Sequence, residues 1–124
     1  MKSKIKKALV HFILFFILSG IALANKTSVE ITAPELVDKG TEVTITINVK
    51  HMGNTAGHFT DWVYLKINGK EVKRWEYTKK DRPEAGNFTL EYTFVVNEKS
   101  KIEVKGNCNK HGSTGAKEFI IDLK

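Results

Sequence analysis

Every second residue from Phe88 to Val96 is apolar, and the residues between them are mostly polar. The same alternation runs from Val43 to Val49. Because successive side chains of a β-strand point to opposite faces, this pattern predicts strands with one buried face. No stretch after residue 24 keeps a helical period over several turns. The chain is therefore expected to be all-β.

Seven short strands are expected after residue 24, and Asn68-Gly69 is expected to join two of them in a tight hairpin. The polar segment Lys79–Asn87 is expected to be a loop. Seven strands in about 100 residues are typical of immunoglobulin-like domains. We therefore predict a seven-stranded immunoglobulin-like β-sandwich, without the disulfide of antibody domains because the chain has one cysteine. The expected strands lie around residues 27–31, 43–49, 58–67, 71–77, 88–96, 102–104 and 119–123.

The first 24 residues have the pattern of a secretory signal peptide. Several lysines precede an apolar segment, Ala8–Leu18, that only His11 interrupts, and Ala22-Leu23-Ala24 matches a cleavage site. We expect cleavage after Ala24, which leaves one domain, residues 25–124, exported to the periplasm or outside the cell. The alternative is an uncleaved helical anchor that holds the same domain at the membrane.

The leader also explains most of the positive charge of the chain. The whole sequence has 20 basic and 14 acidic residues, a net charge of +6. The four lysines of the leader leave 16 basic and 14 acidic residues, a net charge of +2, for residues 25–124. These basic residues are spread along the expected strands rather than clustered, so we expect no nucleic-acid partner.

Cys108 is the only cysteine, so it cannot form a disulfide within the chain. In an exported domain an unpaired thiol indicates intermolecular pairing, a reactive thiol or a metal site. Two residues separate Cys108 from His111 in a turn flanked by Gly106 and Gly112, as in a metal-binding knuckle. The amide N–H groups of such a turn can point at a thiolate. A surface loop with a buried free thiol is the simpler alternative.

Two more histidines, His51 and His58, lie at the ends of successive expected strands, with six residues between them. Both therefore lie at the same end of the predicted sandwich. If the strand that ends near Val104 runs beside them, the turn that follows it brings the cysteine and its histidine to the same place. The candidate metal ligands are His51, His58, Cys108 and His111. The alternative is that each is an ordinary polar residue at a strand end.

Imidazoles with one thiolate suit iron, zinc or copper, and a closed tetrahedral zinc site is the simplest metal site of this composition. Lys50 and Lys110 each adjoin a candidate ligand, where a positive charge would draw an anion toward the metal. Both are therefore candidate catalytic residues for a reaction of an anion. The alternative is that they are ordinary solvated lysines.

The sequence around these residues resembles the iron domain of desulfoferrodoxin, neelaredoxin and superoxide reductase. The resemblance covers nearly all of residues 25–124 and rests on two motifs. These are His51-x6-His58 followed by Thr60-Asp61-Trp62-Val63, and Cys108-Asn109-Lys110-His111-Gly112.

This resemblance implies an immunoglobulin-like sandwich that holds one ferrous iron with four equatorial histidines, an axial cysteine thiolate and one open position. By the matching motifs, His51 and His58 would be equatorial ligands, Cys108 the axial ligand and His111 a third histidine. The implied activity is reduction of superoxide to hydrogen peroxide, with electrons from an external donor such as a rubredoxin-like protein.

The sequence departs from that family in two places. The family commonly has five residues between the first two histidines and a proline after the first, whereas here six intervene and Met52 follows His51. The family's Glu-Lys-His-x-Pro loop, which supplies a further histidine and a lysine, is absent, and Asn25–Lys50 contains no histidine. A complete set of ligands would need a water, a carboxylate or another chain. A homo-oligomer, in which a second copy supplies the ligand, is therefore one of the alternatives.

Two alternatives to the enzyme follow from this loss. One is a non-catalytic metal-binding or electron-transfer module that kept the fold and lost the loop over the metal. The other is a metal-free immunoglobulin-like module for adhesion or protein interaction.

Overall fold

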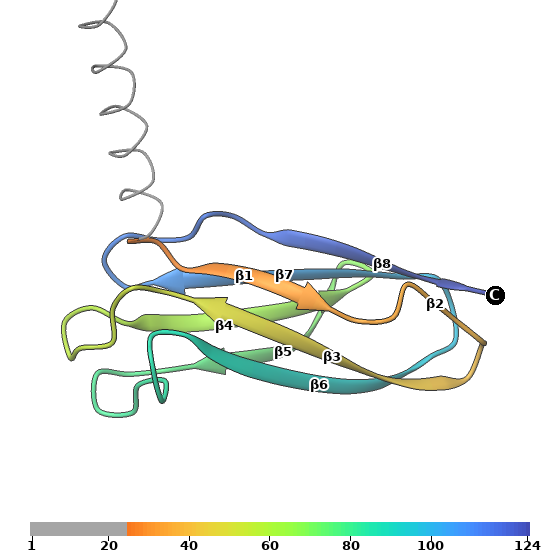
Figure 1. Ribbon diagram of the computed structural model, residues 1–124, viewed down its shortest axis with the longest axis horizontal. Coiled ribbons are helices and arrows are strands. Elements are labelled where there is room, and N and C mark those ends of the chain that lie inside the picture. The colour runs from red at the N-terminus through yellow and green to blue at the C-terminus, as the bar shows by residue number, and fades with distance from the viewer. Residues whose placement is uncertain (1–24) are drawn as a thin grey trace, which may run out of the picture.

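The computed structural model describes residues 25–124, which form two β-sheets packed face to face (Figure 1). One sheet has three strands in the order β1-β3-β6, and the other has five in the order β2-β8-β7-β4-β5. The expected signal peptide, residues 1–24, lies outside the described residues. Within residues 25–124 there is no helix long and apolar enough to cross a membrane. The strands are β1 (Ser28–Thr32), β2 (Leu36–Val37), β3 (Thr41–Lys50), β4 (Thr60–Ile67), β5 (Lys70–Glu76), β6 (Phe88–Val96), β7 (Ser100–Cys108) and β8 (Lys117–Leu123).

The prediction of an all-β sandwich is confirmed, with one strand more than expected. The extra strand, β2, has two residues, too few to show an alternating pattern, and it pairs in parallel with the end of β8. β7 is longer than the expected segment of residues 102–104 and continues to Cys108. Its second half shows no apolar alternation in the sequence because Gly106 occupies an inward position.

Side chains that alternate along the strands fill the space between the two sheets. Ile45 of β3 and Leu65 of β4, for example, have no exposed surface. Gly106 lies where the sheets approach closely, because a Cβ there would be 2.8 Å from Cγ2 of Thr27 and 3.2 Å from Cγ1 of Val29. The close approach brings the first described residues against the end of β7.

The turn between β4 and β5 has the geometry that its sequence predicts. Asn68 and Gly69 both have positive φ, 51° and 82°, as the two central residues of a type I′ turn do. Oδ1 of Asn68 accepts a 2.8 Å hydrogen bond from N of Lys101, which ties the turn to β7. The hairpin is therefore held both by its own backbone and by the neighbouring strand.

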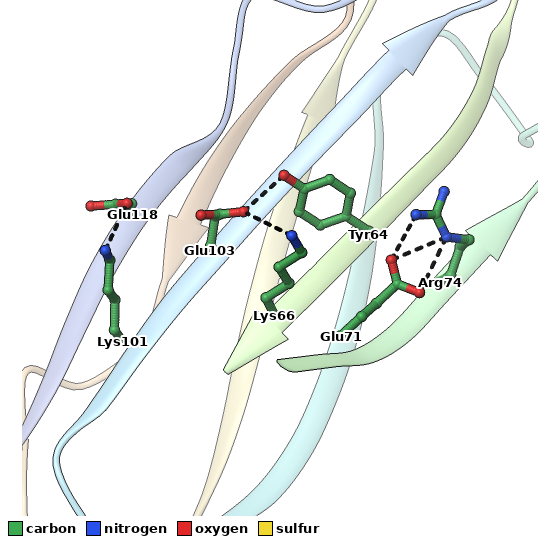
Figure 2. A network of polar contacts seen from close by, with 7 residues as sticks. All are labelled: Tyr64, Lys66, Glu71, Arg74, Lys101, Glu103 and Glu118. Carbon is green, nitrogen blue, oxygen red and sulfur yellow. Dashed lines mark hydrogen bonds and ion pairs between the residues drawn. The ribbon is translucent and has the colours of Figure 1, made fainter. Parts of the chain in front are cut away.

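The solvent-facing side of the five-stranded sheet carries paired polar side chains (Figure 2). Tyr64 Oη donates a 2.8 Å hydrogen bond to Glu103, which links β4 to β7. Partial burial and this hydrogen bond raise the pKa of Tyr64 to about 12. On β5, Arg74 and Glu71 form an ion pair of 2.6 Å. Trp62 stacks on Tyr64 with ring centroids 5.8 Å apart, so it belongs to this face rather than to the core.

Replacing Leu65 by alanine should destabilise the fold by about 2–4 kcal/mol, because the fully buried side chain would leave a cavity. Leu36→Ala in β2 is the matched control, since Leu36 is 52% exposed. We expect it to cost less than about 0.5 kcal/mol. Urea unfolding of both variants measures the difference, and equal losses would contradict the observed core.

Candidate metal centre

Three side chains with metal-binding atoms meet at one end of the sandwich. His51 directly follows β3, His58 lies two residues before β4, and Cys108 is the last residue of β7. Figure 1 shows the ends of β3 and β7 and the start of β4 together, at the left of the view. The ligand atoms of the three residues lie within 4.8 Å of one another. Nε2 of His51 is 3.2 Å from Nε2 of His58.

His51 is the most buried of the three candidate histidines, with 5% of its surface exposed. Its amide donates a 3.0 Å hydrogen bond to Oδ1 of Asn87, in the loop between β5 and β6. Burial lowers the pKa of His51 below its usual range and the neighbouring His58 lowers it further, while the backbone of Gly53 and Asn25 opposes this in part. The neutral imidazole is the form that binds a metal ion, so burial favours the form needed for coordination.

The ring of His58 is held between two other imidazoles and the backbone of its own loop. Its centroid lies 4.7 Å from that of His51 and 4.9 Å from that of His111, and both pairs of rings are nearly perpendicular. Thr55 and His58 exchange two backbone hydrogen bonds, of 2.9 and 3.2 Å, which close the loop. A Cβ on Gly53 would lie 2.5 Å from Nδ1 of His58. No larger residue fits at Gly53 unless the ring moves.

Cys108 is 1% exposed and begins a tight turn. Cys108 and Gly112 exchange two backbone hydrogen bonds, of 2.8 and 3.0 Å, and Gly112 has a positive φ of 78°, which favours glycine. The amide of His111 donates to Sγ of Cys108 at 3.4 Å. An N–H group aimed at sulfur stabilises the thiolate, which is the form that binds metals.

Asn109 fastens the cysteine turn to the loop that carries His58. Its amide donates to O of Phe59 at 3.1 Å, and its Oδ1 accepts from N of Phe59 at 3.0 Å. Its Nδ2 donates to O of Gly57 at 3.3 Å. The positions of the thiol and of the His58 ring are therefore coupled through the side chain and backbone of one residue.

The remaining candidate residues lie around this group of three. His111 is exposed, and its ring contacts that of His58 from outside the group. Nζ of Lys110 lies 3.9 Å from the position of a Cβ on Gly57, over the loop that carries His58. Nζ of Lys50 forms a 3.0 Å ion pair with Glu30 on the exposed side of β3. Among residues 25–124, no ion pair involves Lys110.

The loop between β5 and β6 contributes to the site in a way that the sequence does not indicate. Its composition predicts only a solvated polar loop. In the structure Asn54 Nδ2 donates a 2.9 Å hydrogen bond to O of Pro83, and a Cβ on Gly86 would lie 2.6 Å from O of His51. Asn54 and Pro83 are 29 residues apart in the chain. No local pattern could reveal contacts over such separations.

The geometry and chemistry of the group fit a transition-metal ion. Two imidazole nitrogens that bind one metal at about 2.1 Å are about 3.0–3.4 Å apart, and the two Nε2 atoms here are 3.2 Å apart. Two nitrogens and a sulfur suit iron, zinc or copper, whereas calcium and magnesium prefer oxygen ligands. No carboxylate belongs to the group within the described part of the chain. A cluster of histidine and cysteine side chains compatible with a metal is thus present.

Comparisons with known proteins assign the chain to a family and a fold. A family model described as Desulfoferrodoxin matches residues 20–115, and no curated protein sequence matches. A variant of the superoxide reductase (neelaredoxin) from Ignicoccus hospitalis is 21% identical, with a TM-score of 0.68 over 84% of this chain and 86% of that chain. A candidate superoxide reductase from Thermotoga maritima is 24% identical, with a TM-score of 0.62 over 78% of this chain and 86% of that chain.

A third similar structure is the CARDB domain of a Pyrococcus furiosus protein in complex with two metal ions. It is 16% identical, with a TM-score of 0.57 over 81% of this chain and 94% of that chain. Sequence identities this low show only that the folds are shared. Membership of a family rests instead on the family model, which matches most of the sequence. The chain belongs to the desulfoferrodoxin family and has the fold of the superoxide reductases.

Proposed function

We propose that the protein is an exported mononuclear iron protein that reduces superoxide to hydrogen peroxide. The observation that carries the proposal is the 3.2 Å approach of the Nε2 atoms of His51 and His58 beside the buried thiol of Cys108. These three residues would hold the iron, and His111 would join them by turning its exposed ring. Membership of the family and the superoxide reductases among the similar structures support the choice of metal and substrate.

Bound iron would supply the electron that superoxide takes up, and two protons complete each hydrogen peroxide. The chain has a single cysteine, so it cannot build a second iron centre from cysteines. We therefore infer that a separate redox protein, rubredoxin-like or of another kind, returns the electron.

The protein's own groups prepare this site. The amide of His111 donates to Sγ of Cys108 at 3.4 Å, and burial favours neutral His51. The loop between β5 and β6 covers the backbone of His51, whereas His111 and Lys110 are exposed. An anion would therefore approach from the side of His111 and Lys110.

Lys110 is the better candidate for attracting superoxide. Its ammonium group lies over the loop of His58, and no carboxylate among the described residues pairs with it. Lys50 is the weaker candidate because Glu30 neutralises part of its charge. A positive charge beside the site raises the local concentration of an anionic substrate.

Export would place the reaction in the periplasm or outside the cell. The support is the leader pattern of residues 1–24, with its lysines, its apolar segment and its cleavage motif. If the leader stays attached, the domain would act at the membrane surface.

A non-catalytic metal-binding module is the second candidate function. The missing Glu-Lys-His-x-Pro loop favours it, because the resemblance gives that loop a ligand and the charge that attracts superoxide. A site of this kind could hold zinc or copper instead of iron. Azide separates the two functions: it should shift the visible spectrum of the ferric protein if a coordination position is open, and leave it unchanged if the site is closed.

Pulse radiolysis of the iron-loaded protein tests the enzymatic function. The second-order rate constant with superoxide should fall by about tenfold or more in Cys108→Ser, because a hydroxyl donates less electron density than a thiolate. The variant should also lose the sulfur-to-iron charge-transfer band of the ferric protein while iron stays bound to histidine. An unchanged rate constant would exclude the enzyme, and a surviving band would exclude Cys108 as a ligand.

Gly53→Ala should weaken metal binding about 10- to 100-fold, because the new Cβ would lie 2.5 Å from Nδ1 of His58 and displace the ring. Gly57→Ala is the matched control in the same loop, since the nearest atom to its Cβ would be Nζ of Lys110 at 3.9 Å. Competition with a chromophoric chelator for Zn²⁺ measures both affinities. Similar affinities for the two variants would mean that the orientation of His58 does not matter for the metal.

Lys110→Met should lower the rate constant with superoxide about two- to tenfold at low ionic strength, and added salt should reduce the difference. Lys50→Met tests the other candidate lysine. Lys101→Met is the control, because it removes an equal charge near the opposite end of β7 from Cys108. If Lys50→Met or Lys101→Met has the larger effect, Lys110 does not attract the substrate.

A further inference from the structure

The candidate site is one nitrogen short of the ligand set that the family resemblance implies. His51 and His58 lie in the close group with the thiol, and His111 lies next to it. No other histidine occurs after residue 24. No carboxylate joins the group within residues 25–124, so a further ligand would be a water, another chain or a different group of this chain.

The start of the described chain passes directly beside this site. Ser28 pairs with Lys50 in the antiparallel pair of β1 and β3, so the residues before Ser28 run past His51. Thr27 leaves this pair and joins the segment after the cysteine turn. Its amide donates to O of Gly112 at 3.2 Å, and its carbonyl accepts from N of Thr114 at 3.0 Å.

Thr27 is a fixed anchor for the residues in front of it. Its side chain is fully buried, and its Oγ1 lies 3.0 Å from Oγ1 of Thr60, the residue that pairs with Cys108. Asn25 is two residues away and can reach at most about 7 Å from this anchor. Any group at Asn25 is therefore confined to the end of the sandwich that carries the thiol and the histidines.

The backbone of Asn25 lies near the imidazole of His51, where it partly offsets the lowering of the pKa of that ring. Nδ1 of His51 is buried and has no hydrogen-bond partner among the described residues, so Asn25 makes no hydrogen bond to that atom. A chain end at Asn25 could pivot about Thr27 toward the group of ligand atoms.

We propose that the α-amino nitrogen of Asn25, released when the leader is cut after Ala24, is a further ligand of the metal. This inference rests on the proposed metal site and on the expected cleavage. Within the Ala24–Asn25 peptide bond the nitrogen is an amide whose lone pair is delocalised. Hydrolysis adds one water, leaves a carboxylate on Ala24 and gives Asn25 a primary amine. Once it loses its proton, this amine is a nitrogen donor like the imidazoles.

If Asn25 binds the metal, the set of ligands would be complete only after the protein is exported and its leader is removed. Before cleavage the site would have the two buried histidines, the thiol and the exposed His111. After cleavage it would gain one nitrogen, so its affinity for metal would rise only where the leader is removed. The protein would then take its metal from those present outside the cytoplasm. Which metal binds would depend on the supply of each metal there as much as on its affinity.

Two forms of the protein that differ by one residue test the inference. One begins at Asn25 and the other keeps Ala24, which moves the α-amine one residue away. Residues 25–124 contain both sheets and the core, so each form includes the whole fold. A third form is the first with its α-amine acetylated. Thermal unfolding of the metal-free forms should give the same Tm, which excludes an effect on the fold.

The form that begins at Asn25 should bind Zn²⁺ about tenfold or more tightly than the other two, measured by chelator competition. Its Co²⁺ complex should also have a different visible spectrum, because one more nitrogen changes the ligand field. Equal affinities and spectra in all three forms would overturn the inference and leave the metal site intact. If none of the forms binds metal, the proposed function is lost as well. An N-terminus other than Asn25 in the exported protein would also overturn it.

Discussion

The register between β4 and β7 is the constraint on which the candidate site depends. Thr60 of β4 pairs with Cys108 of β7, so His58, two residues before Thr60, lies opposite the cysteine turn. A slip of one residue would turn the buried side chains of a strand to solvent, which the apolar core opposes strongly. Core residues such as Val63 and Val104 therefore determine where the side chains of His51, His58 and Cys108 lie, although they are not part of that group.

Hydrogen bonds within and between the loops hold the residues of the candidate site in position, in addition to the strand register. Asn109 binds the backbone of Phe59 and Gly57, and Gly112 closes the turn around the thiol. These bonds do not involve a metal. The loops therefore lose their conformational entropy during folding, and binding of a metal would not have to order them. His51, His58 and Cys108 are consequently held together by the fold, whereas the ring of His111 lies outside that group.

The sequence predicts the fold and the candidate residues because both depend on local patterns. Alternation in segments such as Phe88–Val96 indicates strands, and His51 and His58 at the ends of strands indicate a shared end of the sandwich. The cover that the loop between β5 and β6 gives to His51, and the need for glycine at Gly53, depend on contacts between distant or folded segments. The same holds for the position of Asn25 near His51, which follows from the pairing of β1 with β3.

The number of nitrogen ligands separates the two candidate functions. With His51, His58, His111 and Cys108 alone, the site would have the three nitrogens and one sulfur of a closed tetrahedral zinc site. A fourth nitrogen, from Asn25, would give five protein ligands, one more than a closed tetrahedral zinc site holds. The loop between β5 and β6 covers the backbone of His51, whereas Lys110 and His111 are exposed. An enzyme that acts on a small anion needs an open coordination position and a nearby positive charge, and the candidate for that charge, Lys110, lies in the cysteine turn.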